Sequence, residues 1–172
     1  MFFRIQALFL LLSCSLFAEE LAGRVVRVAD GDTITILDPA RTQYKIRLQG
    51  IDAPEKGQPF GRASGRFLAC LVAGRNVKIQ WSKKDKYGRI LGTVFLDNRD
   101  INLEMLQAGF AWHYKRFDST TAYTRAETEA RAAKRGLWQD KNPVEPHEYR
   151  KACDPHGLIQ SMEFSRPEYW SG

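Results

Sequence analysis

The sequence predicts an α+β, mainly β fold, a five-stranded OB-type barrel with about three appended helices. Residues 23–49 contain three short segments in which apolar and polar side chains alternate. After Pro59 the apolar residues recur at helical spacing, and two further strand-like segments precede the last helices. Three strands, a helix, two strands and then helices is the order found in barrels of the OB type.

The first three strands are predicted from apolar residues that recur at every second position and therefore share one buried face. Asp30-Gly31 marks the turn after the first strand, and Asp38-Pro39 marks the turn after the second. In chain order we expect the buried faces to carry Val26 and Val28, then Ile34 and Ile36, then Tyr44, Ile46 and Leu48.

The next three elements, a helix and two strands, are predicted from changes in the spacing of apolar residues. Apolar and small residues recur at helical spacing from Phe60 to Leu71, and Gly74 ends this helix. A fourth strand is predicted over residues 77–81 and a fifth over residues 90–96, because apolar and polar residues alternate again.

Two helices are expected after the fifth strand. Asp100 can cap a short helix that runs up to Gly109. Asp118-Ser119 opens a longer helix, which Gly136 stops. Its inner stripe is expected to consist of Ala122, Ala126, Ala130 and Ala133, with Tyr123 alongside.

The 172 residues divide into four predicted segments. Residues 1–18 form a signal peptide and residues 19–138 form the barrel domain. Residues 139–156 form a C-terminal extension packed on this domain. Residues 157–172 are a tail that is either disordered or not native to the domain.

The N-terminal segment indicates export. Arg4 precedes an apolar run over residues 5–17, and the small residue Ala18 lies at the expected cleavage site. A membrane anchor is one alternative. Lipidation is another, since residues 11–14 resemble a bacterial lipobox that ends at Cys14. We expect a mature protein without a membrane span that is secreted or periplasmic, or else lipid-anchored at the cell surface.

The charge balance favours polyanionic partners. The chain has a formal net charge of +6 at pH 7, and the first eighteen residues contribute only Arg4 to it. Cys70 and Cys153 would remain after export. They either form a disulfide between the tail and the body or stay as two free thiols, with Cys70 a small core residue.

Five charged residues stand where predicted elements begin or end: Asp32, Arg47, Asp52, Glu55 and Arg89. Hydrolysis of a phosphodiester requires a hard cation, a carboxylate that activates or orients water, and rigid donors for the phosphate oxygens. Carboxylates suit Ca²⁺, and arginine forks suit phosphate. The dispersed histidines and the lack of a lysine in the glycine-containing segment at 57–61 argue against a zinc site and a phosphate-binding loop.

The chain resembles staphylococcal nuclease homologues in four consecutive blocks, over about residues 25–151. The blocks are Asp30-Gly31-Asp32-Thr33, then residues 47–55 (RLQGIDAPE), then residues 85–89 (DKYGR), then the helix from Asn102 to Gly109. The resemblance implies a calcium-dependent endonuclease that acts on DNA and RNA and leaves 3′-phosphates.

The resemblance also implies a role for each matching residue. Asp32 and Asp52 would bind Ca²⁺, Glu55 would activate or position the attacking water, and the phosphate would be bound by Arg47 and Arg89. The terminal phosphate of the substrate would lie near Lys86 and Tyr87, and a base would stack near Tyr114.

One position departs from the family. Ala53 stands where the founding enzyme has a threonine that binds the metal through its backbone carbonyl. A backbone ligand survives this change, so Ala53 stays among the expected metal-binding residues.

Two other kinds of function stay open. One is an OB-type module that binds nucleic acid without cutting it, by stacking and a basic groove. The other is a structural protein at the cell surface. We expect a monomer without a stable protein partner.

Overall fold

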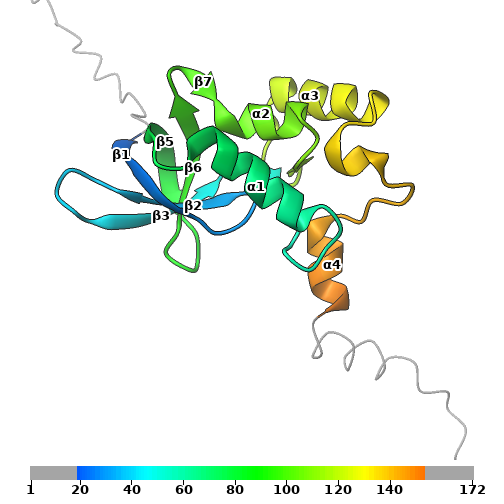
Figure 1. Cartoon of the computed structure of the whole chain (residues 1–172), viewed down its shortest axis with the longest axis horizontal. Coiled ribbons are helices and arrows are strands. Elements are labelled where there is room, and N and C mark those ends of the chain that lie inside the picture. Colours follow the sequence, from blue (N-terminus) through cyan, green and yellow to red (C-terminus); the bar gives the residue numbers. More distant parts are fainter. Residues whose placement is uncertain (1–18, 154–172) are drawn as a thin grey trace, which may run out of the picture.

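The computed structural model describes residues 19–153, and these residues form the predicted barrel. Figure 1 shows the strands on one side of the molecule and the longer helices on the other. The five long strands are β1 (Glu19–Val28), β2 (Thr33–Leu37), β3 (Gln43–Leu48), β5 (Asn76–Lys84) and β6 (Ile90–Leu96). They hydrogen-bond in the order β3-β2-β1-β5-β6, and parallel pairing of β3 with β6 closes the barrel.

The barrel interior is filled by the alternating apolar residues of the strands. Ile34, Ile36, Ile46 and Leu48 are all buried, which confirms the predicted inner faces of β2 and β3. The predicted inner face of β1 is wrong at Val26, which is 46% exposed while Val25 is buried, but Val28 is partly buried and packs against the core as predicted. The register between β1 and β2 shifts between Val25 and Arg27, and such a bulge interrupts the two-residue period.

Three helices cover the barrel, and Figure 1 shows them gathered on one side of it. They are α1 (Gly61–Val72), α2 (Ile101–Gln107) and α3 (Thr121–Ala132). Asp100 caps α2 as predicted, since its carboxylate accepts a hydrogen bond from the backbone N–H of Leu103 at 2.9 Å.

The inner stripe of α3 was predicted only in part. Ala126, Ala130 and Tyr123 are buried, but Ala122 and Ala133 are exposed. The buried face also includes the charged residue Glu127.

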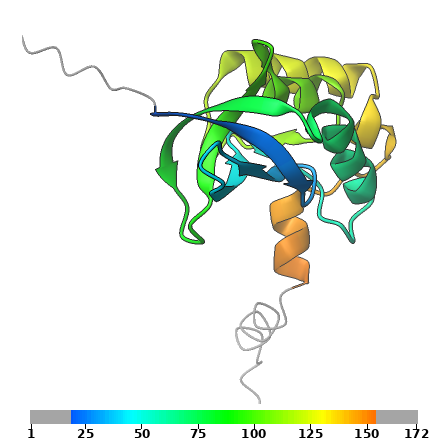
Figure 2. The same ribbon diagram turned by 60° about the vertical axis from the view of Figure 1, so that its left-hand side comes forward.

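Several short elements were not predicted. They are β4 (Ile51–Asp52), β7 (Arg99–Asp100), β8 (Trp112–His113), the 3₁₀ helix η1 (Gly136–Gln139) and α4 (Pro146–Ala152). Figure 2 shows α4 below the barrel, directed away from it. The expectation of about three helices therefore missed the fourth, α4.

The two cysteines after the signal segment do not bond to each other. Cys70 on α1 and Cys153 after α4 are both free and exposed. The structure thus has neither the bridge nor a buried Cys70. Within residues 19–153 no helix has the length and apolarity needed to cross a membrane. The predicted signal peptide and the 157–172 tail lie outside the described residues.

Candidate active site

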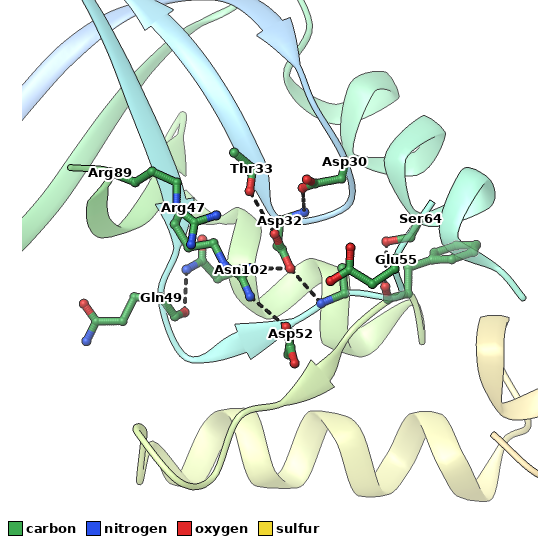
Figure 3. A network of polar contacts seen from close by, with 12 residues as sticks. Asp30, Asp32, Thr33, Arg47, Gln49, Asp52, Glu55, Ser64, Arg89 and Asn102 are labelled. Atoms are coloured by element: carbon green, nitrogen blue, oxygen red, sulfur yellow. Dashed lines mark hydrogen bonds and ion pairs between the residues drawn. The ribbon is translucent and has the colours of Figure 1, made fainter. Parts of the chain in front are cut away.

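Four of the predicted site residues meet where β2, β3 and β4 come together. Asp32 lies just before β2, Arg47 lies on β3, Asp52 ends β4, and Glu55 lies in the turn that follows (Figure 3). The antiparallel register places Thr33 opposite Arg47, which brings the Arg47 side chain next to Asp32. Gly50, with φ of 77°, allows the tight turn from β3 into β4.

The carboxylate of Asp32 is fixed by two hydrogen bonds and an ion pair. Its Oδ2 atom accepts a hydrogen bond from the backbone N–H of Ala53 at 2.8 Å and pairs with Nη1 of Arg47. Its Oδ1 atom accepts a hydrogen bond from the hydroxyl of Thr33 at 3.0 Å. Asp32 is 6% exposed, so this charge is held in a defined direction away from bulk water.

Arg47 joins the two aspartates that were predicted to bind metal. Nη1 contacts Asp32, and Nη2 donates to Oδ1 of Asp52 at 2.7 Å (Figure 3). Burial lowers the pKa of Arg47, but the charges of Asp32 and Asp52 outweigh it and raise the pKa overall. The guanidinium is therefore always charged, and it offsets the repulsion between the two carboxylates.

The position of Asp52 depends on a two-residue strand. In β4, Asp52 pairs with Trp112 of β8, and Ile51 pairs with His113. Glu127 on α3 supports β8, since its Oε1 atom accepts a hydrogen bond from the backbone N–H of His113 at 3.2 Å. The side chain of Asp52 is 2% exposed. Burial raises its pKa, although hydrogen bonds from Arg150 and the charge of Arg47 oppose that effect.

A second acid lies close to Asp32. Asp30 accepts a hydrogen bond from the backbone N–H of Asp32 at 3.1 Å. Burial first, and then the negative charge of Asp32, raise the pKa of Asp30 to about 6. Several acidic side chains thus lie close together at the end of the barrel where β2, β3 and β4 meet.

Arg150 is a residue of this site that sequence reasoning missed. It comes from α4, and its Nη1 donates to Oε1 of Glu55 at 2.7 Å. Its Nη2 donates to Oδ2 of Asp52 at 3.0 Å, and Nη1 also lies 3.3 Å from Oδ1 of Asp52. These contacts span 95 and 98 positions of sequence, so no local pattern announces them.

Local signals for α4 itself were present in the sequence. Pro146 stands in the first turn of the helix, Glu148 follows in that turn, and Arg150 and Lys151 stand in the last turn. This arrangement suits the helix dipole and the fixed φ of proline.

Arg89 does not contact the carboxylate cluster and is held by its own loop instead. Its Nε atom donates to Oδ2 of Asp85 at 2.7 Å. Asp85 also accepts hydrogen bonds from the backbone N–H groups of Tyr87 and Arg89, each at 2.9 Å. Figure 3 places Arg89 on the side of Arg47 and away from Glu55. The two predicted phosphate-binding arginines thus flank the same side of the network.

The three remaining predicted contacts with substrate lie outside the cluster. Tyr87 is 72% exposed, with Nζ of Lys86 5.0 Å from the centre of its ring. Tyr114 lies beyond β8, where its backbone N–H donates to the carbonyl of Gly50 at 2.9 Å and its ring packs against Phe117. All three lie in loops at the ends of strands, where Lys86 and Tyr87 are exposed and Tyr114 is partly buried.

The residues expected to bind a metal form an all-oxygen set. Asp32 and Asp52 offer carboxylates, and Ala53 offers a backbone carbonyl between Asp52 and Glu55. Oxygen donors fit Ca²⁺ or Mg²⁺ rather than zinc. Within residues 19–153 no three His, Cys, Asp or Glu side chains form a metal-binding group. A cation held by the two aspartates would therefore need carbonyl oxygen, water and substrate to complete its shell.

Comparisons with known proteins point to one family. The family model described as "Staphylococcal nuclease homologue" matches residues 45–140. A Haemophilus influenzae protein called an uncharacterized endonuclease is 43% identical over 133 residues, which are 77% of this chain and 75% of that protein. An Escherichia coli protein with the same description is 44% identical over 139 residues, covering 80% and 90% of the two chains. A probable staphylococcal-like nuclease of Oryza sativa is 37% identical over 133 residues, but these are only 34% of its length.

Proposed function

Since the chain belongs to the staphylococcal nuclease family, we propose that it is a calcium-dependent endonuclease that hydrolyses phosphodiester bonds of DNA and RNA and leaves 3′-phosphates. The observation that carries this proposal is the contact network of Asp32, Arg47 and Asp52, to which Arg150 joins Glu55. It places two buried carboxylates, a shared guanidinium and a more exposed acid at one end of the barrel.

Each residue of the network has a distinct part in the proposed reaction. Asp32 and Asp52, with the carbonyl of Ala53, would hold the cation, which polarises a phosphate oxygen when it is bound. The Glu55 side chain is 39% exposed, so a water molecule can reach its carboxylate and lose a proton to it or be oriented by it.

The arginines would act on the charge that develops during the attack. Arg47 is rigid, because two carboxylates hold its fork, and it presents fixed positive charge beside the phosphate position. Arg89 would approach the same phosphate from the loop at 85–89, where Asp85 directs its guanidinium. Lys86, Tyr87 and Tyr114 would bind the neighbouring phosphate and base along the strand.

A nuclease assay on labelled DNA and RNA oligonucleotides tests this proposal, with Ca²⁺ and then with excess chelator after the metal is stripped. We expect cleavage to require the cation. Glu55→Gln keeps the shape of the side chain and removes its charge, so turnover should fall by roughly 10²–10⁴ while oligonucleotide affinity changes little. Glu129→Gln on α3 is the matched control, because that acid is exposed and forms a surface ion pair with Arg125.

The result also separates an enzyme from a module that only binds nucleic acid. A binding module would show no cleavage with any cation, and its affinity would change equally in both glutamine variants. Cleavage that persists in full under chelation would remove the cation from the mechanism.

We also propose that the protein acts as a monomer outside the cytoplasm, after removal of residues 1–18. Mass spectrometry of protein recovered from the periplasm or medium tests this. An N-terminus at Glu19 is expected, whereas a lipid-modified Cys14 would mean that the protein is anchored.

A further inference from the structure

The C-terminal helix α4 reaches the candidate active site through one side chain, that of Arg150. We propose that Arg150 is a positioning residue, which holds the carboxylate of Glu55 beside that of Asp52 in the orientation needed to act on water. Nη1 donates to Glu55 at 2.7 Å, while Nη2 donates to Asp52 at 3.0 Å. The inference rests on the proposed nuclease function and adds to it a residue outside the four blocks that carry the family resemblance.

Glu55 needs such a partner because of where it stands. It lies in an irregular turn after β4, and its backbone N–H is fixed by Oε1 of Gln58 at 3.1 Å. Among the described residues, the contact that its carboxylate makes is with Arg150. Two carboxylates repel each other, so without Arg150 the half-exposed Glu55 side chain would turn towards water and away from the buried Asp52.

The geometry of the contact favours arginine over a simple positive charge. One guanidinium reaches three oxygens, two on Asp52 and one on Glu55. A planar fork fixes both the distance and the relative orientation of two carboxylates, whereas the ammonium of lysine is a single point of charge. Arg150 is 43% exposed, so one side of this arrangement stays open to water and substrate.

The helix that carries Arg150 is itself attached close to Glu55. Nε2 of Gln58 donates to the carbonyl of Val144 at 2.6 Å, just before α4 begins. Pro146 is buried, and Tyr149 lines a small pocket together with Pro54 and Gln58. The segment on both sides of Glu55 therefore anchors the helix that fixes the Glu55 side chain.

The experiment compares turnover of the mature protein with that of Arg150→Ala and Arg150→Lys, each in the native and in the Glu55→Gln background. Lys151→Ala is the matched control, because it removes the same charge from the next position of α4, where the side chain is exposed. Turnover is measured at saturating Ca²⁺ and oligonucleotide, per folded molecule, with enough enzyme to follow the residual cleavage by Glu55→Gln.

We expect Arg150→Ala to lower turnover by about 10- to 100-fold with Glu55 present, and by less than about twofold in the Glu55→Gln background. Arg150→Lys should recover only part of the loss, and Lys151→Ala should stay within about twofold of the unaltered protein. Calcium binding without nucleic acid, measured by calorimetry, should be tighter in Arg150→Ala, because a positive charge leaves the vicinity of the metal site.

Every other pattern overturns the proposal. If Arg150→Ala binds calcium more tightly and its turnover is unchanged or faster, Arg150 competes with the cation. An equal loss in both backgrounds would make it a substrate contact, and weaker calcium binding would make it a support of the metal site. If the native protein is inactive, the proposed nuclease function is refuted. If it is active but the effects of Arg150→Ala and Glu55→Gln on turnover are additive, only the role of Arg150 is refuted.

Discussion

Arg47 offers the sharpest test of how the carboxylate cluster is held together. Its guanidinium lies between Asp32 and Asp52, and its side chain is 12% exposed. We consider Arg47→Met, which keeps the length and most of the volume of the side chain and removes its charge. The two aspartates then face each other with most of their compensation lost and with little access to water.

The magnitude follows from the burial of these charges. Removing one partner of a buried ion pair typically costs about 3–5 kcal/mol, because the remaining charge has lost water without gaining a counter-ion. Asp52 retains Arg150, whereas Asp32 loses its one ion pair among the described residues. We therefore expect the free energy of unfolding in excess chelator to fall by about 3 kcal/mol.

A divalent cation should reverse much of this loss. Binding to the folded state stabilises it by about 2.7 kcal/mol when the free cation is at 100 times its dissociation constant. The variant site is more negative than the native one, so the cation should bind it more tightly. Stability should recover with Ca²⁺ while turnover stays low, since Arg47 is also expected to bind the phosphate.

Urea unfolding followed by fluorescence, in chelator and across a calcium series, measures both effects. Arg62→Met is the control, because Arg62 is exposed on α1 and contacts none of these acids. A loss below about 1 kcal/mol in chelator, or no dependence on calcium, would show that Arg47 does not hold the two carboxylates together.

Two further predictions concern the supports of the site. Asp85→Asn removes the charge that directs Arg89 and should lower turnover about tenfold, with no further loss in an Arg89→Ala background, as oligonucleotide kinetics would show. Glu127→Gln should lower the free energy of unfolding by about 3 kcal/mol at pH 7. Burial alone would raise the pKa of Glu127, but the hydrogen bond from Lys115 and the charge of Arg131 bring it below its usual value. The charge of Glu127 therefore stabilises the fold at pH values above the unfolded-state pKa, and this stabilisation is lost as the pH falls through the lower folded-state pKa. In pH-dependent denaturation, the free energy of unfolding of the variant should therefore fall less steeply in acid.

The barrel could be predicted because its strands obey a local rule. Ile34 and Ile36 on β2, and Ile46 and Leu48 on β3, alternate without interruption and are buried as expected. The same rule was wrong for Val26 in β1, because the bulge beside Val25 adds a residue that the period-two pattern does not allow for. A bulge depends on the pairing of two strands and leaves no signal within one strand.

The two-residue strands β4 and β8 could not be predicted for a related reason. No periodicity can be seen in two residues, and their pairing joins Asp52 to Trp112 across 60 positions of the chain. This pairing nevertheless orients Asp52 in the site. The sequence indicated the chemical type of the candidate residues, but the contacts that orient them come from tertiary structure.

Arg150 shows the same limit more strongly. Its own segment carries helix signals, yet nothing in residues 139–153 indicates that one of its charges faces Asp52 and Glu55. Arg89 is the opposite case, because a compact motif at 85–89 suffices to predict a phosphate-binding arginine there, and the structure shows that Asp85 holds its side chain. Its role stays a prediction, but a compact motif allows such a prediction from sequence, whereas a contact between distant segments requires the fold.

The balance of charge in the cluster has a consequence for the order of binding. Among residues 19–153, Asp32, Asp52 and Glu55 pair with two guanidiniums, those of Arg47 and Arg150. Asp30 adds a further acid, whose pKa is raised to about 6. The cluster by itself is therefore negative and repels a phosphodiester. A divalent cation bound by the aspartates, as proposed, would remove this repulsion, and a bound phosphate would in turn supply further oxygen ligands to it. Because such coupling is reciprocal, each of the two ligands must strengthen the binding of the other by the same factor.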